Sequence, residues 1–185
     1  MKFALFGLPR SGTTWAANWL SDGAALCLHD PIAQHAPADL LDLDMGRPWG
    51  VACTGLWAFE DVAREVAGRC PVVVLERDPR ESEKLAAGIG LDLPASVHAW
   101  IHARFAGVPG VRVPHSALWD EQGARRIWSI LRPGEPFDVL RWRMLRDIRV
   151  EPILERVEVC AATVAALRGV FNQGEHHGEE TAATT

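Results

Sequence analysis

The sequence has no long apolar run, and this absence excludes a membrane-spanning helix. No apolar stretch approaches the roughly 18 residues that such a helix needs. The apolar start, Met1–Leu8, is shorter than a secretory signal, and Pro9 and Arg10 close it. We therefore expect a cytoplasmic protein that makes no membrane contact.

Cysteine is also scarce, and no two cysteines are spaced as a CxxC motif, which argues against a zinc or redox site of that type. The four cysteines are Cys27, Cys53, Cys70 and Cys160. The first three lie in or beside apolar segments, which favours buried thiols in a reducing compartment. His98 and His102 have the spacing of two metal ligands on a helix, but no third ligand lies nearby, so we expect no metal.

Lysine is nearly absent, and the chain has no excess of positive charge. It carries 19 Lys and Arg against 24 Asp and Glu, a net charge of −5. This balance is not that of a nucleic-acid-binding protein. The only lysines are Lys2 and Lys84. The remaining cations are arginines, which suit bidentate anion binding, although a GC-rich genome would give the same bias.

The length of 185 residues fits a single domain. Apolar runs predict strands at Phe3–Phe6, Ala24–Leu28, Val51–Thr54, Pro71–Leu75 and Val111–Val113. Helical patterns separate them at Gly12–Leu20, Asp39–Asp44, Phe59–Val66, from Asp78 onward, Ser96–Phe105 and Glu121–Leu131. This alternation predicts an α/β, three-layer fold with a mostly parallel sheet of about five strands and helices on both faces.

The pattern changes after Arg132, because no further strand is expected. A helix should open at Phe137 and Asp138, and a last helix should run from Pro152 to about Phe171. We expect this helical C-terminal extension to pack on the sheet or over its ligand-binding edge. The domain then covers residues 1–171, and the polar tail 172–185 should be disordered.

The most specific segment follows the first strand and opens the first helix, which is where phosphate-binding loops occur. Backbone N–H groups and the helix dipole favour an anion there. The segment matches the Walker A pattern at Gly7, Gly12 and Thr14, but Thr13 stands at the lysine position and the cation is Arg10. ATP transfer normally uses that lysine with Mg²⁺, so a donor with less charge at its reacting end fits better.

The run Pro9-Arg10-Ser11-Gly12-Thr13-Thr14-Trp15 resembles the 5′-phosphosulfate loop of the sulfotransferases that use 3′-phosphoadenosine 5′-phosphosulfate (PAPS). The overall layout is similar to the short phage and bacterial sulfotransferase-like branch. His29-Asp30-Pro31 and Pro133–Asp138 resemble segments of that branch, so the resemblance covers about residues 2–150. It implies a P-loop sulfotransferase-like domain whose co-substrate is PAPS, bound by this run.

The resemblance also implies that the turn Arg77-Asp78-Pro79-Arg80 reads the 3′-phosphate of the donor. In the family a serine follows this arginine at the position that Leu85 holds here, and Ser82 lies nearer the turn. The family's later Arg-Lys-Gly clamp is missing. The alternative interpretation is a helix-start turn with solvated arginines.

Candidates for a catalytic base follow from the rule that open parallel sheets bind ligands at the carboxyl ends of their strands. The residues expected there are His29, Asp30, Thr54, Arg77 and His115. Attack by a hydroxyl needs a positioned base, and His29 is the first choice because histidine titrates near neutral pH. Three roles are open for Asp30: it orients His29, it is itself the base, or it only caps the next helix. His35 is a weaker candidate, and His115 another.

Together these features predict a sulfotransferase that moves a sulfuryl group from PAPS to a hydroxyl or amine of a small-molecule or glycan acceptor. Arg10 and the amides of Ser11–Thr14 would hold the 5′-phosphate, and His29 or Asp30 would accept the proton. The alternatives are an ATP-dependent small-molecule or nucleotide kinase and a nucleotide-binding protein without catalysis.

Overall fold

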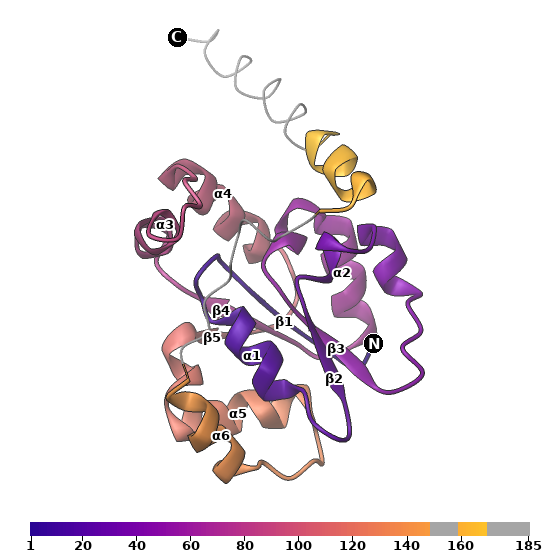
Figure 1. The fold of residues 1–185 in the computed structure, drawn as a ribbon, viewed down its shortest axis with the longest axis vertical. Helices are drawn as coiled ribbons and strands as arrows, with labels where there is room; N and C mark the ends of the chain where they lie inside the picture. The colour runs from indigo at the N-terminus through magenta and orange to yellow at the C-terminus, as the bar shows by residue number, and fades with distance from the viewer. Residues whose placement is uncertain (149–158, 170–185) are drawn as a thin grey trace, which may run out of the picture.

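The computed structural model describes residues 1–148 and 159–169 and has the predicted α/β architecture (Figure 1). Its sheet contains five parallel strands in the order β2-β3-β1-β4-β5. The strands are β1 (Phe3–Gly7), β2 (Leu26–His29), β3 (Trp49–Cys53), β4 (Val72–Glu76) and β5 (Val111–Pro114). All five predicted strands are confirmed, with ends that differ by one or two residues.

The helices follow the strands as the alternation predicted. They are α1 (Thr13–Leu20), α2 (Glu60–Arg69), α3 (Pro79–Ala87), α4 (Ala95–Ala106), α5 (Glu121–Leu131) and α6 (Val139–Arg146). Short 3₁₀ turns lie at η1 (Pro31–Ala33), η2 (Pro37–Leu41), η3 (Gly55–Ala58) and η4 (His115–Leu118). The helical piece expected at Asp39–Asp44 is therefore the turn η2, which begins earlier because Pro37 favours its first position.

The C-terminal extension is helical where the structure describes it. Asp138 caps α6, as expected, by accepting a hydrogen bond from the amide of Arg141. Residues 161–169 are helical within the last helix predicted, and the rest of that helix and the tail 172–185 lie outside the described residues. No helix in the described ranges is both long and apolar enough to cross a membrane.

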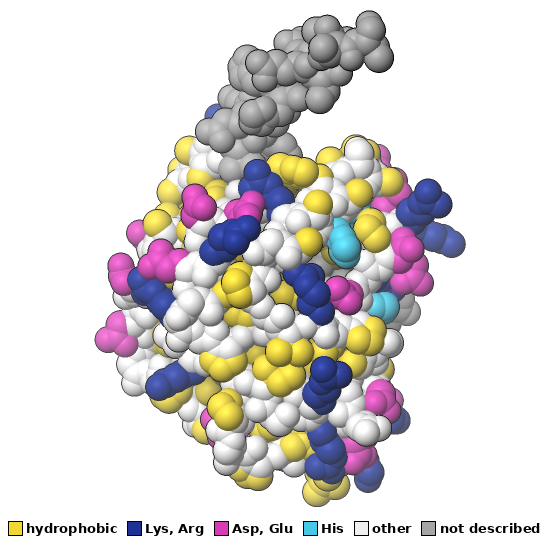
Figure 2. Space-filling model, turned by 180° about the vertical axis from the view of Figure 1, so that it is seen from behind, with side chains coloured by type: hydrophobic (Ala, Val, Ile, Leu, Met, Phe, Trp, Pro, Cys, Tyr) yellow, Lys and Arg dark blue, Asp and Glu magenta, His cyan; other side chains and the backbone are white. Residues whose placement is uncertain are grey.

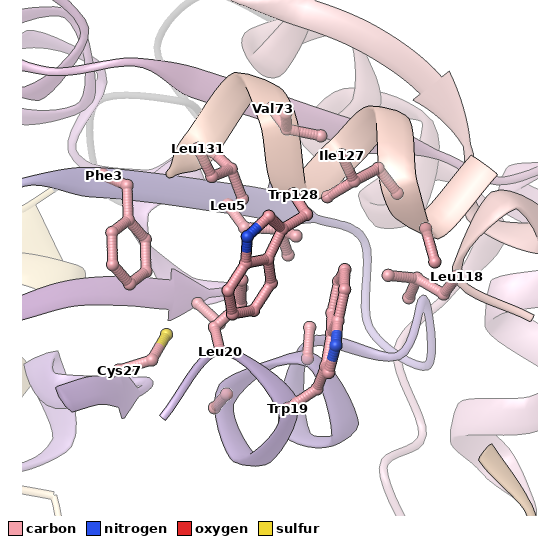
Figure 3. Close-up of a cluster of buried hydrophobic side chains, with 14 of the residues drawn as sticks. Phe3, Leu5, Trp19, Leu20, Cys27, Val73, Leu118, Ile127, Trp128 and Leu131 are labelled. Carbon is pink, nitrogen blue, oxygen red and sulfur yellow. The ribbon is translucent and has the colours of Figure 1, made fainter. Parts of the chain in front are cut away.

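Two apolar clusters fill the space between the sheet and its helices. One cluster packs α1, α5 and α6 on one face and includes Trp19, Trp128 and Trp142. Figure 3 shows Trp128 beside the strand residue Leu5, with Trp19 next to Trp128 in the same cluster. The other cluster packs α2, α4 and η3 on the opposite face. Because both faces are covered, the inner strands β1, β3 and β4 are apolar apart from the exposed Glu76 at the end of β4, as a parallel sheet requires.

A buried ion-pair network ties the end of α5 to the end of α1. The Arg132 side chain donates to Asp22 Oδ2 at 2.5 Å, to the carbonyl of Leu20 and to the carboxylate of Glu135. Its guanidinium also lies 4.5 Å from the centre of the Trp128 ring. Burial would raise the pKa of Asp22, but the hydrogen bonds from Arg132 and from two backbone amides outweigh it and lower that pKa.

The surface opposite the view of Figure 1 mixes the two signs of charge. Figure 2 shows basic and acidic side chains interspersed with apolar ones on this face, without an extended area of one sign. On α2, exposed charges pair along the helix, as Arg64 does with Glu60 and Arg69 with Glu65. Such exposed pairs contribute little to stability.

Candidate functional site

The carboxyl ends of the five strands lie at one edge of the sheet, and the predicted site residues follow them. Two groups form there around the β1–α1 loop, Leu8–Gly12. The first consists of hydroxyls, an imidazole and a carboxylate, and its members are Thr13, Thr14, His29, Asp30 and Thr54. The second braces the loop from the opposite side, and its members are Arg77, Ser82 and His98.

The β1–α1 loop begins with a tight turn. The amide of Ser11 donates to the carbonyl of Leu8 at 3.1 Å, which places Pro9 and Arg10 at the two central positions. A type II turn favours proline at its second position and needs a positive φ at its third. Pro9 holds the second position, and Arg10 at the third has a φ of 64°. Glycine is the usual residue at that position, so Arg10 is held in a conformation that costs about 1 kcal/mol or more.

The start of α1 offers backbone donors to a ligand. Gly12 precedes the helix with a φ of 91°, a conformation that favours glycine. No side chain caps the first turn, and no acidic residue lies in it. The hydroxyl of Ser11 is buried and has no hydrogen-bond partner among the described residues. Uncapped amides beside a buried, unsatisfied hydroxyl are typical of an anion-binding site.

His29 joins the loop side chains through one ring nitrogen. Its Nε2 lies 3.0 Å from Thr14 Oγ1 and 3.4 Å from Thr13 Oγ1. The same nitrogen is 3.2 Å from Asp30 Oδ2. Because an ionised carboxylate only accepts hydrogen bonds, Nε2 carries the proton and donates it. With the proton on Nε2, Nδ1 is the ring nitrogen that can accept a proton.

Asp30 is fixed by the end of β3. Its Oδ1 accepts hydrogen bonds from the amides of Thr54 at 2.5 Å and Gly55 at 3.2 Å. The residue has a φ of 41°, an unusual value for a residue other than glycine. Its side chain does not cap η1, so the interpretation of Asp30 as a plain helix cap is wrong. The carboxylate reaches across to β3 and holds the His29 ring instead.

Arg77 is largely buried and braces the loop. One guanidinium nitrogen donates to the carbonyl of Arg10, and Nε lies 3.3 Å from Glu81 Oε2. The side chain is 13% exposed, so the picture of a solvated arginine is wrong for Arg77, although Arg80 is exposed. Asp78 caps α3 as predicted by accepting from the amide of Arg80 at 2.7 Å. That Arg77 reads a 3′-phosphate remains a prediction.

Trp15 and His35 lie apart from these groups, whereas His115 lies near Arg77 of the second group. Trp15 is buried, and its indole donates to the carbonyl of Leu145 at 2.8 Å, so its ring anchors α1 to α6. The backbone carbonyl of His35 accepts from Thr163 Oγ1 at 3.2 Å, beyond the turn η1. His115 lies near Arg77, and burial together with that positive charge lowers the pKa of His115.

Sequence reasoning missed the pair formed by Ser82 and His98. Ser82 Oγ lies 2.6 Å from the carbonyl oxygen of Pro9 and 3.0 Å from His98 Nδ1. Both side chains are 0% exposed. The sequence offered a weak signal, since a serine one turn into α3 and a histidine among the apolar residues of α4 are both polar groups on buried faces. Their meeting depends on how the two helices pack, which no local pattern encodes.

The burial of His98 predicts a specific pH dependence of stability. Burial lowers the pKa of His98, and the nearby Glu83 offsets only part of that effect. Below about pH 6.5 the unfolded chain binds a proton at this histidine that the folded chain does not bind. The contribution of neutral His98 to the free energy of unfolding is therefore fully present above that pH. It decreases as the pH falls, by at most about 1.4 kcal/mol per pH unit.

Urea unfolding at pH 7.5 and pH 5.5 measures this effect. The loss of unfolding free energy between the two values should be smaller in His98→Asn than in the unchanged protein. Comparing the two chains cancels the contribution of the other histidines. An identical loss in both would show that His98 titrates normally in the fold.

Comparison with known proteins finds no match to the chain, neither in family models nor among curated proteins or solved structures. Within residues 1–148 and 159–169, no three or more His, Cys, Asp or Glu side chains gather as a metal site would require. What the fold and the site define is an α/β protein with an uncapped helix start and a histidine–carboxylate pair at one sheet edge.

Proposed function

We propose that the protein is a sulfotransferase that moves a sulfuryl group from PAPS to a hydroxyl or amine acceptor. The observation that carries the proposal is the placement of the His29 ring within 3.4 Å of both Thr13 and Thr14 hydroxyls at the uncapped start of α1. The His29 ring thus lies beside the uncapped helix start, with Nε2 toward the loop. The resemblance of residues 9–15 to a phosphosulfate-binding loop agrees with this chemistry.

The 5′-phosphate of the donor binds at the start of α1. The amides of Gly12, Thr13 and Thr14 supply hydrogen bonds, and the Arg10 guanidinium supplies charge. Ser11 contributes through its buried hydroxyl, because its amide already closes the turn on Leu8. This differs from the expected role of the Ser11 amide, since the turn conformation consumes that donor.

Transfer forms one bond and breaks one bond at sulfur. The acceptor oxygen or nitrogen attacks the sulfur atom, and the bond from sulfur to the bridging oxygen breaks, leaving its electron pair on the 5′-phosphate. Arg10 stabilises the charge that develops on this oxygen. The acceptor proton passes to His29 Nδ1, and Asp30 stabilises the resulting imidazolium through Nε2. The products are the sulfated acceptor and adenosine 3′,5′-bisphosphate.

A turnover assay tests the role of His29. Release of the bisphosphate from PAPS is measured with alcohol, phenol, amine and glycan acceptors. His29→Ala should lower turnover about 10²-fold, at the lower end for loss of a general base because Asp30 remains. Its affinity for the bisphosphate should change less than its turnover, since Arg10 and the amides at the start of α1, and not His29, hold the phosphate in the proposed mechanism.

His102→Ala is the matched control, because His102 lies on α4 outside both groups of site residues. Turnover in this variant should equal that of the unchanged protein. Equal turnover in His29→Ala would assign the base elsewhere. Transfer from ATP that requires Mg²⁺ would overturn the proposal in favour of a kinase, and bisphosphate binding without turnover would favour a binding protein.

A further inference from the structure

Two successive carbonyls of the β1–α1 loop are held from the same segment of the chain. The carbonyl of Pro9 accepts from Ser82 Oγ at 2.6 Å, and the carbonyl of Arg10 accepts from Arg77. Both donors belong to the stretch that leaves β4 and forms α3. The turn that carries the strained Arg10 is therefore fixed from outside, by residues about 70 positions further along the chain.

Holding these carbonyls also directs the backbone amides of the loop. In a trans peptide the C=O and N–H groups point in opposite directions. When Ser82 draws the Pro9 carbonyl toward α3, the N–H of Arg10 faces away from α3. The Arg10 carbonyl shares its peptide with the Ser11 N–H, which closes the turn on Leu8. The two contacts thus oppose relaxation of Arg10 to a negative φ.

His98 fixes the direction of the Ser82 hydroxyl. A carbonyl oxygen only accepts, so Ser82 uses its single proton on Pro9. The short contact with His98 Nδ1 must then be a donation from the imidazole to Ser82 Oγ. The remaining ring nitrogen, Nε2, is buried without a hydrogen-bond partner among the described residues.

A polar pair of this kind is a poor means of filling a core. Burying a hydroxyl and an imidazole costs free energy that an apolar pair of similar volume would not incur. Both residues are 0% exposed and lie between α3 and α4, where apolar side chains would pack. The hydrogen bond that they deliver to Pro9 is the specific result of placing them there.

We propose that Ser82 and His98 are positioning residues, which set the affinity for the donor by holding the loop turn without touching the donor. This inference rests on the proposed function for its ligand. It assigns to α3 and α4 a role in binding, although neither helix supplies a group to the anion through this pair.

Calorimetric titration with adenosine 3′,5′-bisphosphate tests the proposal. Loss of one such hydrogen bond predicts a roughly tenfold weaker affinity in Ser82→Ala and in His98→Ala. His98→Asn keeps an N–H donor near the position of Nδ1 and should recover most of the affinity. Ser129→Ala is the matched control, because Ser129 also donates to a backbone carbonyl but lies exposed on α5.

Thermal unfolding of the same variants separates positioning from plain stability. A merely structural role would lower Tm in Ser82→Ala and leave the affinity of the folded protein unchanged. That result would overturn the inference. Weaker binding at a temperature far below Tm, with recovery in His98→Asn, would support it.

Hydrogen exchange without ligand keeps the inference testable if the proposed function is wrong. Peptides covering residues 6–14 should exchange faster in Ser82→Ala than in the unchanged protein, while peptides from α5 should not. Failure of the unchanged protein to bind bisphosphate would count against the proposed function alone. Unchanged exchange over residues 6–14 would count against the inference alone.

Discussion

Replacing Arg10 by alanine should lower transfer from PAPS by roughly 10³-fold. This is the upper end of the loss for one preorganised electrostatic contact, and Arg10 serves both the bound phosphate and the leaving oxygen. The fold should survive, because Arg10 is a half-buried loop residue and its carbonyl can still accept from Arg77. Steady-state turnover with PAPS, together with Tm, measures both parts of the prediction.

Arg10→Gly separates the charge from the backbone strain. Glycine adopts the observed φ of 64° without cost, so this variant removes the cation and relieves the turn. It should lose as much turnover as Arg10→Ala while its Tm equals or exceeds that of the unchanged protein. Arg126→Ala is the charge control, because Arg126 is exposed on α5, away from the loop. Turnover near normal in both Arg10 variants would remove Arg10 from the mechanism.

Replacing Arg132 by alanine should destabilise the fold by about 3–5 kcal/mol. The substitution removes a large side chain that is 1% exposed, leaves the carbonyl of Leu20 without its donor and leaves the partly exposed carboxylates of Asp22 and Glu135 without their partner. The ring of Trp128 also loses its stacked guanidinium. For a chain of this length the change corresponds to a fall in Tm of roughly 10 °C. Urea unfolding and calorimetry measure the two quantities.

The control for this prediction lies on the same helix. Arg126 is exposed on α5, and Arg126→Ala should change stability by less than about 0.5 kcal/mol. Asp22→Asn combined with Arg132→Met should cost less than Arg132→Ala, since the double change leaves no unpaired Asp22 charge. A loss below about 1 kcal/mol in Arg132→Ala would show that the network contributes little.

The sheet could be predicted because its signals are local. The run Val72–Leu75 is apolar throughout, as a strand buried on both faces requires, and the Asp78-Pro79 cap marks the following helix. Strand ends shifted where the local signal is weak: β2 begins at Leu26 and includes His29, because its register with β3 sets its limits.

The candidate site could be predicted as a set of residues but not as a set of contacts. The rule for strand ends placed His29, Asp30 and Thr54 at one edge of the sheet, and the structure brings them together. The hydrogen bonds from Arg77 and Ser82 to the loop join positions far apart in the chain. Such contacts arise from packing, so the sequence could suggest the loop and not what holds it.

The most direct test of the account is calorimetric titration of the protein with adenosine 3′,5′-bisphosphate in the absence of Mg²⁺. Saturable binding is expected, lost in Arg10→Ala and strongly weakened in Arg77→Ala, with Arg126→Ala unchanged. A parallel titration with ATP and Mg²⁺ provides the contrast. Absence of bisphosphate binding, with ATP binding that depends on Mg²⁺, would contradict the account.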